Sequence, residues 1–505
     1  MIHDPDPPDL LKDPIKLQTR LKQKPEAFWV ERGEEMALRL FHEMAAGVPA
    51  YKDFLSKNLL NPKKIQTIAD FKQVPTINKD NYLRFYPREM MCWDGKLNNQ
   101  NWVFSTTSGS TGEPYYFPRT SVQDDHYAVA AELYLRENFN IQDKSTLYVD
   151  AFAMGAWIGG LFTYQAIKQV ADRGYRISII TPGTNKIETI NAIKNLAADF
   201  DQVIIGCYPP LLKDIVDLGK EHGVDWTKIN LGIVFSAEGF SEAFRDYIVS
   251  NASLDNVYTS TLNHYGTVDM GTMAHETPLS IFLRRQALDD LALFSALFKG
   301  ISKQPTFAQY LPEMFYFEAV ENNLLCSGYS GLPLVRYDLK DYGGIIKLDQ
   351  VEKIYKEQGK GLDKELASAG IRETKWNLPF VYLYERSDFS VTFMGATIFP
   401  EEIRRALLTK SVTEYVTGKF TLEVVQDKHL DNKLMINVEL KRGVEKSPAI
   451  AGLIQKIIKS VLLLENSEYA NNYASYGRKL LPRIKLWPNE HNAYFDSRGK
   501  HRWIK

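Results

Sequence analysis

The amino-acid sequence predicts an α/β fold, in which a large N-terminal domain has mostly parallel sheets covered by helices and a small C-terminal domain is of the α+β type. Strand and helix patterns alternate from residue 126 to residue 236, which is typical of a parallel sheet. The strand pattern at residues 202–206 is apolar throughout its centre, as expected for a strand that is buried on both faces. A second succession of strands and helices fills residues 389–505. We therefore predict domains at residues 1–385 and 386–505.

The segment before residue 100 predicts a helical scaffold. Met36, Leu40 and Met44 share one helical stripe, which predicts a packing helix over residues 34–46. Residues 75–80 predict a turn into a helix that is capped by Asn78. The first residues are rich in Asp and Pro and lack the basic start of a signal peptide, so we expect an extended arm there.

The central segment predicts four strands and four helices in alternation. The expected strands are residues 146–151, 176–181, 202–206 and 231–236, and the expected helices are residues 126–138, 157–171, 186–198 and 211–221. Ligands of such sheets bind at the carboxyl ends of the strands. The stretches at those ends are residues 154–160, 207–210 and 237–239.

The C-terminal segment predicts strands at residues 421–425, 434–440 and 483–486, with a long helix at residues 448–464. Before it, residues 344–379 are charged and break the period, so we interpret them as a solvated excursion that could form a surface helix pair.

Composition excludes several classes of protein. The net charge of −1, from 61 basic and 62 acidic residues, gives no field that would attract nucleic acid or an anionic membrane. The most apolar window, residues 151–164, is shorter than the ~20 residues that cross a bilayer. The 3 cysteines form no Cys-x-x-Cys pair, which argues against a disulfide framework and a zinc site and favours the cytoplasm.

A run of hydroxyl residues and glycines at residues 105–114 predicts a phosphate-gripping loop. Gly109 and Gly112 allow backbone N–H groups to converge on an anion, and Ser108, Ser110 and Thr111 add hydroxyl donors. The loop is neither a Walker motif nor a dinucleotide fingerprint. An ordinary Ser/Gly surface turn is the alternative.

The same run resembles the Ser/Thr/Gly-rich signature of the adenylate-forming superfamily of acyl-CoA ligases, adenylation domains and luciferases, and the later sequence is most similar to its phenylacetate-CoA ligase branch. The resemblance implies that the turn Ala237, Glu238 and Gly239 contacts adenine. It also implies that Met154 and Trp157 wall the acid pocket, although close helix packing explains these residues equally well. Tyr208 is a further pocket candidate that hints at an apolar or aryl acid.

Residues 264–269 resemble the superfamily's Tyr-Gly-x-Thr/Ser-Glu motif. The resemblance implies that Tyr265 stacks on adenine, that Gly266 lets the backbone approach the acyl group, and that Asp269 binds Mg²⁺. Val268 departs from the motif at the hydroxyl position, where Thr267 next to it could substitute, and Asp269 replaces the usual Glu.

Three later segments complete the resemblance. The Pro-Leu-Val-Arg-Tyr frame at residues 333–337 implies that Asp341, and not Asp338, binds the ribose hydroxyls. Arg386 resembles the arginine that contacts the nucleotide, and Asp388 resembles the hinge to a mobile C-terminal lid, although Glu385 stands where the family has glycine. In the tail, Lys500 resembles the catalytic lysine of a Ser-x-Gly-Lys loop.

Together these matches predict an enzyme that uses ATP and Mg²⁺ to convert a carboxylic acid into an acyl adenylate, with release of pyrophosphate. Thr267 and Lys500 are the catalytic candidates, and the acyl acceptor is most simply the thiol of coenzyme A. Two alternatives stay open: transfer to a carrier protein or an amine, and a nucleotide-binding protein without turnover. The acid, and whether the chain forms a homodimer, also stay open.

Overall fold

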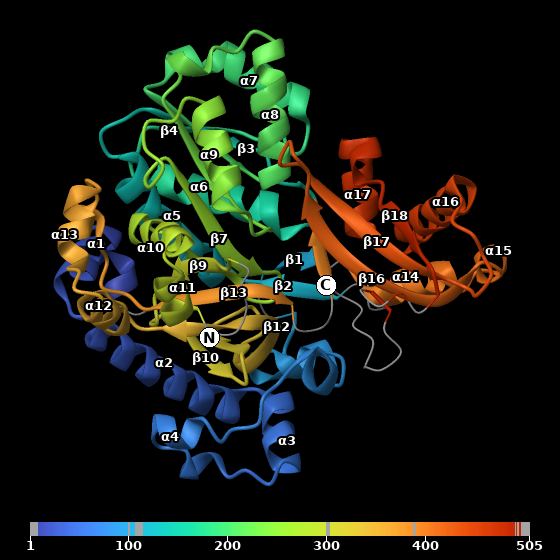
Figure 1. The fold of residues 1–505 in the computed structure, drawn as a ribbon. Helices are drawn as coiled ribbons and strands as arrows, with labels where there is room; N and C mark the ends of the chain where they lie inside the picture. The colour runs from blue at the N-terminus through green and yellow to red at the C-terminus, as the bar shows by residue number, and fades with distance from the viewer. Residues whose placement is uncertain are drawn as a thin grey trace. The chain divides into compact units, whose positions relative to one another are not determined.

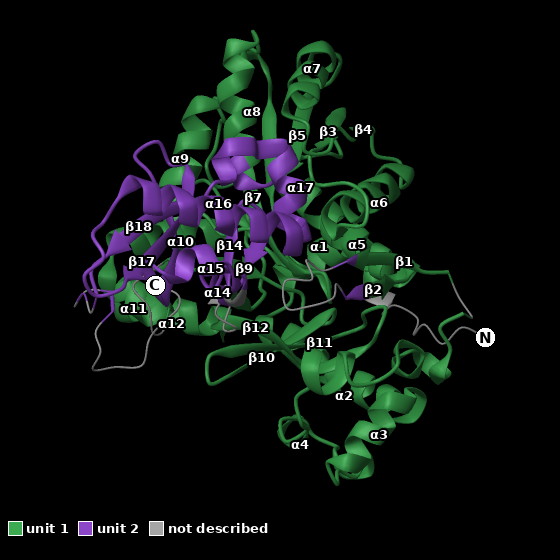
Figure 2. Cartoon of the chain, turned by 90° about the vertical axis from the view of Figure 1, so that its right-hand side faces the viewer, with its two compact units in different colours: residues 1–105, 117–207, 211–384 green, residues 106–116, 208–210, 385–505 purple. Residues whose placement is uncertain are grey.

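The computed structural model describes residues 9–98, 101–106, 115–298, 304–386, 390–489, 491 and 494–495. The chain divides into two compact units, which Figure 2 distinguishes by colour. Unit 1 comprises residues 1–105, 117–207 and 211–384, and unit 2 comprises residues 106–116, 208–210 and 385–505. The beginning of the last segment of unit 2 at Glu385 lies beside the boundary predicted from the sequence.

The described chain begins with a 3₁₀ turn at Asp9–Lys12, so the expected extended arm is wrong for residues 9–11. Helices follow, of which the sequence predicted the one that contains residues 34–46. They are α1 (Pro14–Gln23), α2 (Glu26–Gly47), α3 (Pro49–Lys57) and the single turn α4 (Ile68–Phe71). Met44 and Leu40 of α2 are buried, which confirms the packing stripe. The predicted cap is also confirmed, because the side chain of Asn78 accepts hydrogen bonds from the N–H groups of Asp80 and Asn81, both at 2.9 Å, at the start of a short π-helix.

Unit 1 is built on an 11-stranded sheet with the order β10-β11-β12-β13-β9-β8-β7-β6-β5-β3-β4 (Figure 1). Its parallel half consists of β4 (Ile177–Ile180), β3 (Thr146–Asp150), β5 (Gln202–Cys207), β6 (Leu231–Phe235) and β7 (Thr261–Thr267). The alternating pattern predicts β3, β4, β5 and β6 but not β7, and the α/β class is confirmed. The helices between them are α5 (Ser121–Phe139), α6 (Ile158–Asp172), α7 (Lys186–Leu196), α8 (Pro209–Glu221) and α9 (Glu242–Asn251).

The other half of the sheet is antiparallel, which makes the sheet mixed. It contains β8 (Gly271–His275), β9 (Thr306–Gln309), β10 (Phe315–Val320), β11 (Asn323–Gly328), β12 (Leu334–Ile346) and β13 (Phe380–Arg386). Short connections account for this at β7–β8, β10–β11 and β11–β12, because they leave no room for the helical crossover that parallel neighbours need, whereas β8 and β9 are antiparallel although residues 276–305 separate them. Glu321 and Asn322, for example, join β10 to β11 in a tight turn with φ values of 50° and 66°.

A buried apolar cluster lies between the parallel strands and helices α5 and α6. Ile204, Val234 and Leu262 contribute from the sheet, and Ala131 and Ala166 contribute from the two helices. All five are completely shielded from solvent. This packing covers one face of the sheet and holds the carboxyl ends of β3, β5 and β7 in fixed positions beneath α5 and α6.

The charged segment at residues 344–379 forms the helix pair α12 (Leu348–Glu357) and α13 (Leu362–Ser368). The interpretation as a solvated excursion is wrong for one face of it. Val351, Tyr355 and Leu366 are buried and pack in a cluster with residues of α10 (Pro278–Asp289) and α11 (Leu291–Leu297). The charges lie on the opposite side of α12, as in any amphipathic helix.

Unit 2 has the predicted α+β character. Its three-stranded sheet has the order β16-β17-β18, formed by Val416–Gln426, Asn432–Leu440 and Arg483–Trp487. The long predicted helix is α16 (Pro448–Glu465), followed by α17 (Ser467–Tyr476), and α14 (Pro400–Leu407) and α15 (Lys410–Thr413) precede the sheet. A hairpin of β14 (Val391–Phe393) and β15 (Ala396–Ile398) begins the described part. No helix among the described residues is long and apolar enough to span a membrane.

Candidate functional site

Tyr265, near the end of β7, and Asp341, on β12, meet directly. The phenolic O–H of Tyr265 donates a hydrogen bond of 2.6 Å to the Asp341 carboxylate. Both side chains are buried, and the ring of Phe317 stacks against Tyr265 with 6.1 Å between centroids. Asp338 instead accepts from the backbone N–H and the ammonium group of its neighbour Lys340, at 3.0 Å and 2.7 Å. Of the two aspartates, Asp341 is therefore the one that contacts the predicted adenine-stacking residue.

An irregularity in β12 explains this choice. Lys340 has φ = 60°, and the pairing of β12 with β11 shifts between Asp338 and Tyr342. Regular alternation of side chains is interrupted at such a bulge. The carboxylate of Asp341 consequently points to the other half of the sheet, which strict period-two counting along the strand could not establish.

Asp269 lies in the turn between β7 and β8 and has three neighbours. Its carboxylate accepts a hydrogen bond from the phenolic O–H of Tyr337 and lies 3.5 Å from the ammonium group of Lys79. Its backbone carbonyl accepts from the hydroxyl of Ser330 at 2.7 Å. The Asp269 side chain is 8% exposed and that of Lys79 is 33% exposed, so the pair lies at the edge of the buried region.

Lys79 was not identified from the sequence, where residues 75–80 indicated only scaffold. The backbone explains its position, because Ile77 forms an isolated β-bridge with Tyr337. The N–H of Ile77 donates to the carbonyl of Arg336 at 3.2 Å, and the carbonyl of Ile77 accepts the N–H of Asp338 at 2.9 Å. The cap at Asn78 then turns the chain, which brings Lys79 beside Asp269. No local sequence signal marks this pairing of segments far apart in the chain.

Gly266 and Thr267 have clear structural roles at the start of the same turn. A Cβ added to Gly266 would lie 2.6 Å from the carbonyl oxygen of Gly271, so only glycine allows this close approach of β7 and β8. The hydroxyl of Thr267 accepts the N–H of Met270 at 3.2 Å, and its own proton remains available for donation. These contacts explain why glycine and threonine occur in this turn. The predicted roles of Gly266 toward the acyl group and of Thr267 in catalysis remain predictions.

The turn after β6 holds the predicted adenine-contacting residues. Ala237 has φ = 75°, a left-handed conformation that costs an L-residue about 1–3 kcal/mol. The carbonyl of Glu238 accepts the side-chain amide of Asn263 at 3.2 Å. A Cβ added to Gly239 would lie 3.1 Å from the hydroxyl of Thr306. The strained turn is thus fixed from two sides.

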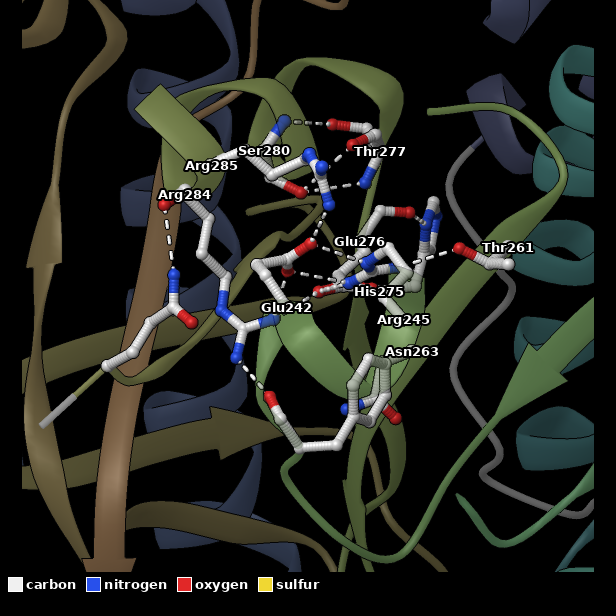
Figure 3. A network of polar contacts seen from close by, with 12 residues as sticks. Glu242, Arg245, Thr261, Asn263, His275, Glu276, Thr277, Ser280, Arg284 and Arg285 are labelled. Atoms are coloured by element: carbon white, nitrogen blue, oxygen red, sulfur yellow. Dashed lines mark hydrogen bonds and ion pairs between the residues drawn. The ribbon is translucent and has the colours of Figure 1, made fainter. Parts of the chain in front are cut away.

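A buried ionic cluster supports this turn (Figure 3). The guanidinium of Arg245 donates to Glu242 at 2.9 Å, to Glu276 at 2.7 Å and to the hydroxyl of Thr261 at 2.6 Å. Arg284 bonds to Glu242 and to the carbonyl of Phe240, directly after the turn. Burial alone would raise the pKa of Glu242, but the two arginines hold it at about 2. Glu242 is therefore ionised, and the cluster joins α9, α10 and β7.

Ser105, the first residue of the predicted phosphate loop, is held by Arg119. The Arg119 side chain donates to the hydroxyl of Ser105 at 2.9 Å and to Asp124 at 2.8 Å. Gln123 accepts the N–H of Gly331 at 2.8 Å and donates to Ser330, the residue that contacts Asp269, at 3.2 Å. The loop residues Ser108, Gly109, Ser110, Thr111 and Gly112 themselves lie outside the described residues.

The remaining predicted residues are less closely defined. Met154 and Trp157 are half-buried, and a Cβ added to Gly160 would lie 2.6 Å from the sulfur of Met154, so this segment packs closely. Tyr208 is buried and directly follows β5. Arg386 ends β13, whereas Asp388 and Lys500 lie outside the described residues.

Comparison with known proteins adds a structural result. No family model matches the sequence, and no curated protein is similar to it. A solved structure of 2-hydroxyisobutyryl-CoA ligase, in complex with 2-HIB-AMP and CoA in the thioesterification state, is similar with a TM-score of 0.64 and 13% identity over 96% of this chain and 91% of that chain. The chain shares the fold of this ligase.

Two other structures of the same ligase are also similar. One is in the postadenylation state with R3-HIB-AMP, with a TM-score of 0.55 and 12% identity over 96% of this chain and 91% of that chain. The other is an open conformation with 2-HIB-AMP and CoA, with a TM-score of 0.54 and 12% identity over 95% of this chain and 92% of that chain. At these identities the likeness defines the fold, and the function follows from the site.

Proposed function

We propose that the chain is an ATP-dependent ligase similar to phenylacetate-CoA ligases, which activates a carboxylic acid as an acyl adenylate and passes the acyl group to the thiol of coenzyme A. The observation that carries the proposal is the buried contact between Tyr265 and Asp341 at 2.6 Å. It joins the two residues that the sequence motifs assign to adenine and ribose, although they are far apart in the chain. The shared fold with a ligase whose structures hold 2-HIB-AMP and CoA supports the proposal.

In this proposal the nucleotide contacts both halves of the sheet. Tyr265 packs against adenine, together with the turn at residues 237–239, and Asp341 accepts both ribose hydroxyls. A carboxylate has two acceptor oxygens, which suits a vicinal diol. Arg386 contacts the nucleotide from the end of β13, and the loop at residues 105–114 binds the phosphates.

Asp269 is the proposed Mg²⁺ ligand. Mg²⁺ commonly takes one or two protein carboxylates and completes its shell with water and phosphate oxygens, so a single Asp fits the ion. Bound Mg²⁺ would neutralise phosphate charge. Lys79, 3.5 Å from Asp269, adds a positive charge next to the same phosphates.

The reaction then needs no protein nucleophile. The substrate carboxylate attacks the α-phosphorus and pyrophosphate leaves, while Thr267 donates to a phosphate oxygen and Lys500 stabilises the negative charge that develops. The thiol next attacks the acyl carbon and AMP leaves. If the C-terminal domain is a mobile lid, Asp388 is the hinge that lets Lys500 withdraw before the thiol enters.

Pyrophosphate release by the full chain, with ATP, Mg²⁺ and a panel of carboxylic acids, tests the proposal. At least one acid is expected to drive release, and addition of CoA is expected to yield a thioester. No release with any acid would leave a nucleotide-binding protein without turnover. Release without transfer to free CoA would instead identify a carrier protein or an amine as the acceptor.

The two half-reactions test the lid. Lys500→Ala is expected to lose pyrophosphate release and still convert a supplied acyl adenylate to thioester. Asp388→Pro fixes φ at about −65°. This variant is expected to retain pyrophosphate release and to lose the conversion of acyl adenylate to thioester. Equal effects of either change on both half-reactions would contradict the moving-lid mechanism.

A further inference from the structure

The face of the parallel sheet beneath α5 and α6 changes character at its carboxyl edge. Along β5, Ile204 lies in the apolar cluster, and the next residue on the same face is Gly206. Along β3, Tyr148 lies in this cluster and the next residue on that face is Asp150, which pairs with Gly206. An apolar core therefore ends in a carboxyl group, a phenol and a glycine, at the edge where sheets of this class bind their ligands.

Two polar atoms of this edge are buried without a partner in the part of the chain that the structure describes. Asp150 is fully buried, and only one of its oxygens has a hydrogen bond, from the N–H of Phe152 at 3.2 Å. The other oxygen and the hydroxyl of Tyr148 have no partner among the described residues. Native proteins normally satisfy such groups with protein, water or a ligand, because an unpaired buried polar atom is destabilising.

The groups also lie close together. A Cβ added to Gly206 would lie 2.5 Å from the Tyr148 hydroxyl and 2.9 Å from the ring of Phe152, so both side chains reach over the same glycine. Phe152 is the residue that contacts Asp150 through its N–H. Tyr127 and Tyr134 of α5 belong to the same buried cluster as Tyr148.

Resting on the proposed ligase function, we propose that Asp150 and Tyr148 bind a hydroxyl group on the acyl part of the substrate, so that the acid is a hydroxylated one. The segment after Asp150 contains Met154 and Trp157, the proposed wall of the acid pocket, so the two groups lie on the strand that leads directly into this wall. A hydroxyl both donates and accepts, as do a phenol and a protonated carboxyl group, so each of the three can satisfy the others.

The chemistry of Asp150 favours a neutral group over an ammonium group. Burial raises its pKa well above the usual range, and no cationic side chain among the described residues offsets that burial. An ammonium ligand would require Asp150 to ionise in this environment, whereas a hydroxyl requires no charge to be buried.

Matched acids that differ by one hydroxyl test the inference: phenylacetate with 4-hydroxyphenylacetate, 3-phenylpropionate with its 4-hydroxyphenyl analogue, and butanoate with 4-hydroxybutanoate. We expect the hydroxylated acid to have at least about tenfold higher kcat/KM for pyrophosphate release in one pair or more. Tyr148→Phe is expected to lower that ratio about tenfold. Tyr355→Phe removes another buried hydroxyl without a described partner, on α12, and is the matched control that leaves the ratio unchanged.

Binding provides a readout that does not depend on turnover. The melting temperature of the full chain is measured with each acid, and hydroxylated acids are expected to raise it more, a difference that Tyr148→Phe removes. Asp150→Asn keeps a donor and an acceptor and is expected to retain part of the preference, whereas Asp150→Leu loses it. Equal stabilisation by both members of every pair would overturn the inference.

Preference for amine-bearing acids, abolished by Asp150→Asn, would also overturn it and identify a cation site. If no acid releases pyrophosphate, the ligase proposal fails, and the melting temperatures still decide whether hydroxylated acids bind.

Discussion

Asp341→Asn separates the proposed ribose contact from a purely structural role of this residue. In the structure, Asp341 accepts the O–H of Tyr265 at 2.6 Å and is buried. Asparagine keeps the shape and still offers a carbonyl oxygen to Tyr265, so the fold should persist. The change removes the negative charge and half of the acceptor capacity that two ribose hydroxyls would use.

The expected size follows from the bonds lost. Hydrogen bonds to a charged group are worth about 1.5–3 kcal/mol each. Two of them give about 3–6 kcal/mol, and every ~1.4 kcal/mol is a factor of ten in affinity. Because asparagine retains one acceptor, we expect the lower end of this range, a rise of about 100-fold in the dissociation constant for ATP.

Calorimetric titration with ATP measures this constant without turnover. Asp338→Asn is the matched control, since Asp338 is partly exposed and its carboxylate contacts Lys340 at 2.7 Å. The control is expected to bind ATP like the parent protein. A large loss of affinity in Asp338→Asn with little change in Asp341→Asn would refute the assignment of Asp341 to the ribose.

Three further changes test other features. Asp269→Asn removes the charge of the proposed Mg²⁺ ligand, so half-maximal pyrophosphate release should need about tenfold more Mg²⁺; an unchanged titration would remove Asp269 from the site. Burial raises the pKa of Glu402 from 4.5 to about 7, so the folded state binds its proton more tightly and loses about 3 kcal/mol of stability as the pH rises through that interval. Glu402→Gln should lack this loss, and equal urea midpoints for parent and variant at both about pH 5 and about pH 8 would contradict it. Arg245→Met removes the nearest cation of the buried Glu276 carboxylate and one of the three arginines that contact Glu242. It should therefore lower the free energy of unfolding by about 3–5 kcal/mol, and more than Arg285→Met, whose side chain is 25% exposed; similar urea midpoints for the two variants would refute this.

The parts of the fold that the sequence predicts correctly depend on local patterns. The strands β3, β4, β5 and β6 were found because a buried parallel strand is continuously apolar and its helices have a different period. The cap at Asn78 follows from an amide side chain at the start of a turn. The register that favours Asp341 over Asp338 came from a motif, and the contact with Tyr265 agrees with it.

Other features depend on pairings between distant segments and have no local signal. Lys79 reaches Asp269 only because Ile77 pairs with Tyr337. Part of the antiparallel half follows from short connections that look like ordinary loops in the sequence, and the antiparallel pairing of β8 with β9 joins strands that residues 276–305 separate. In α12, charged residues conceal the buried positions Val351 and Tyr355, whose spacing is helical.

Two hydrogen bonds of the same kind join the halves of the sheet in opposite directions. Tyr265 of β7 donates to Asp341 of β12, and Tyr337 of β12 donates to Asp269 in the turn after β7. β13, β9 and β8 separate these strands in the sheet order, so the ladder itself does not hold them together. A phenol orients a carboxylate without neutralising it, because it donates one bond and carries no charge. Each of the two bonds thus fixes the direction of a carboxylate, which the proposed functions of Asp341 toward a diol and of Asp269 toward Mg²⁺ both require.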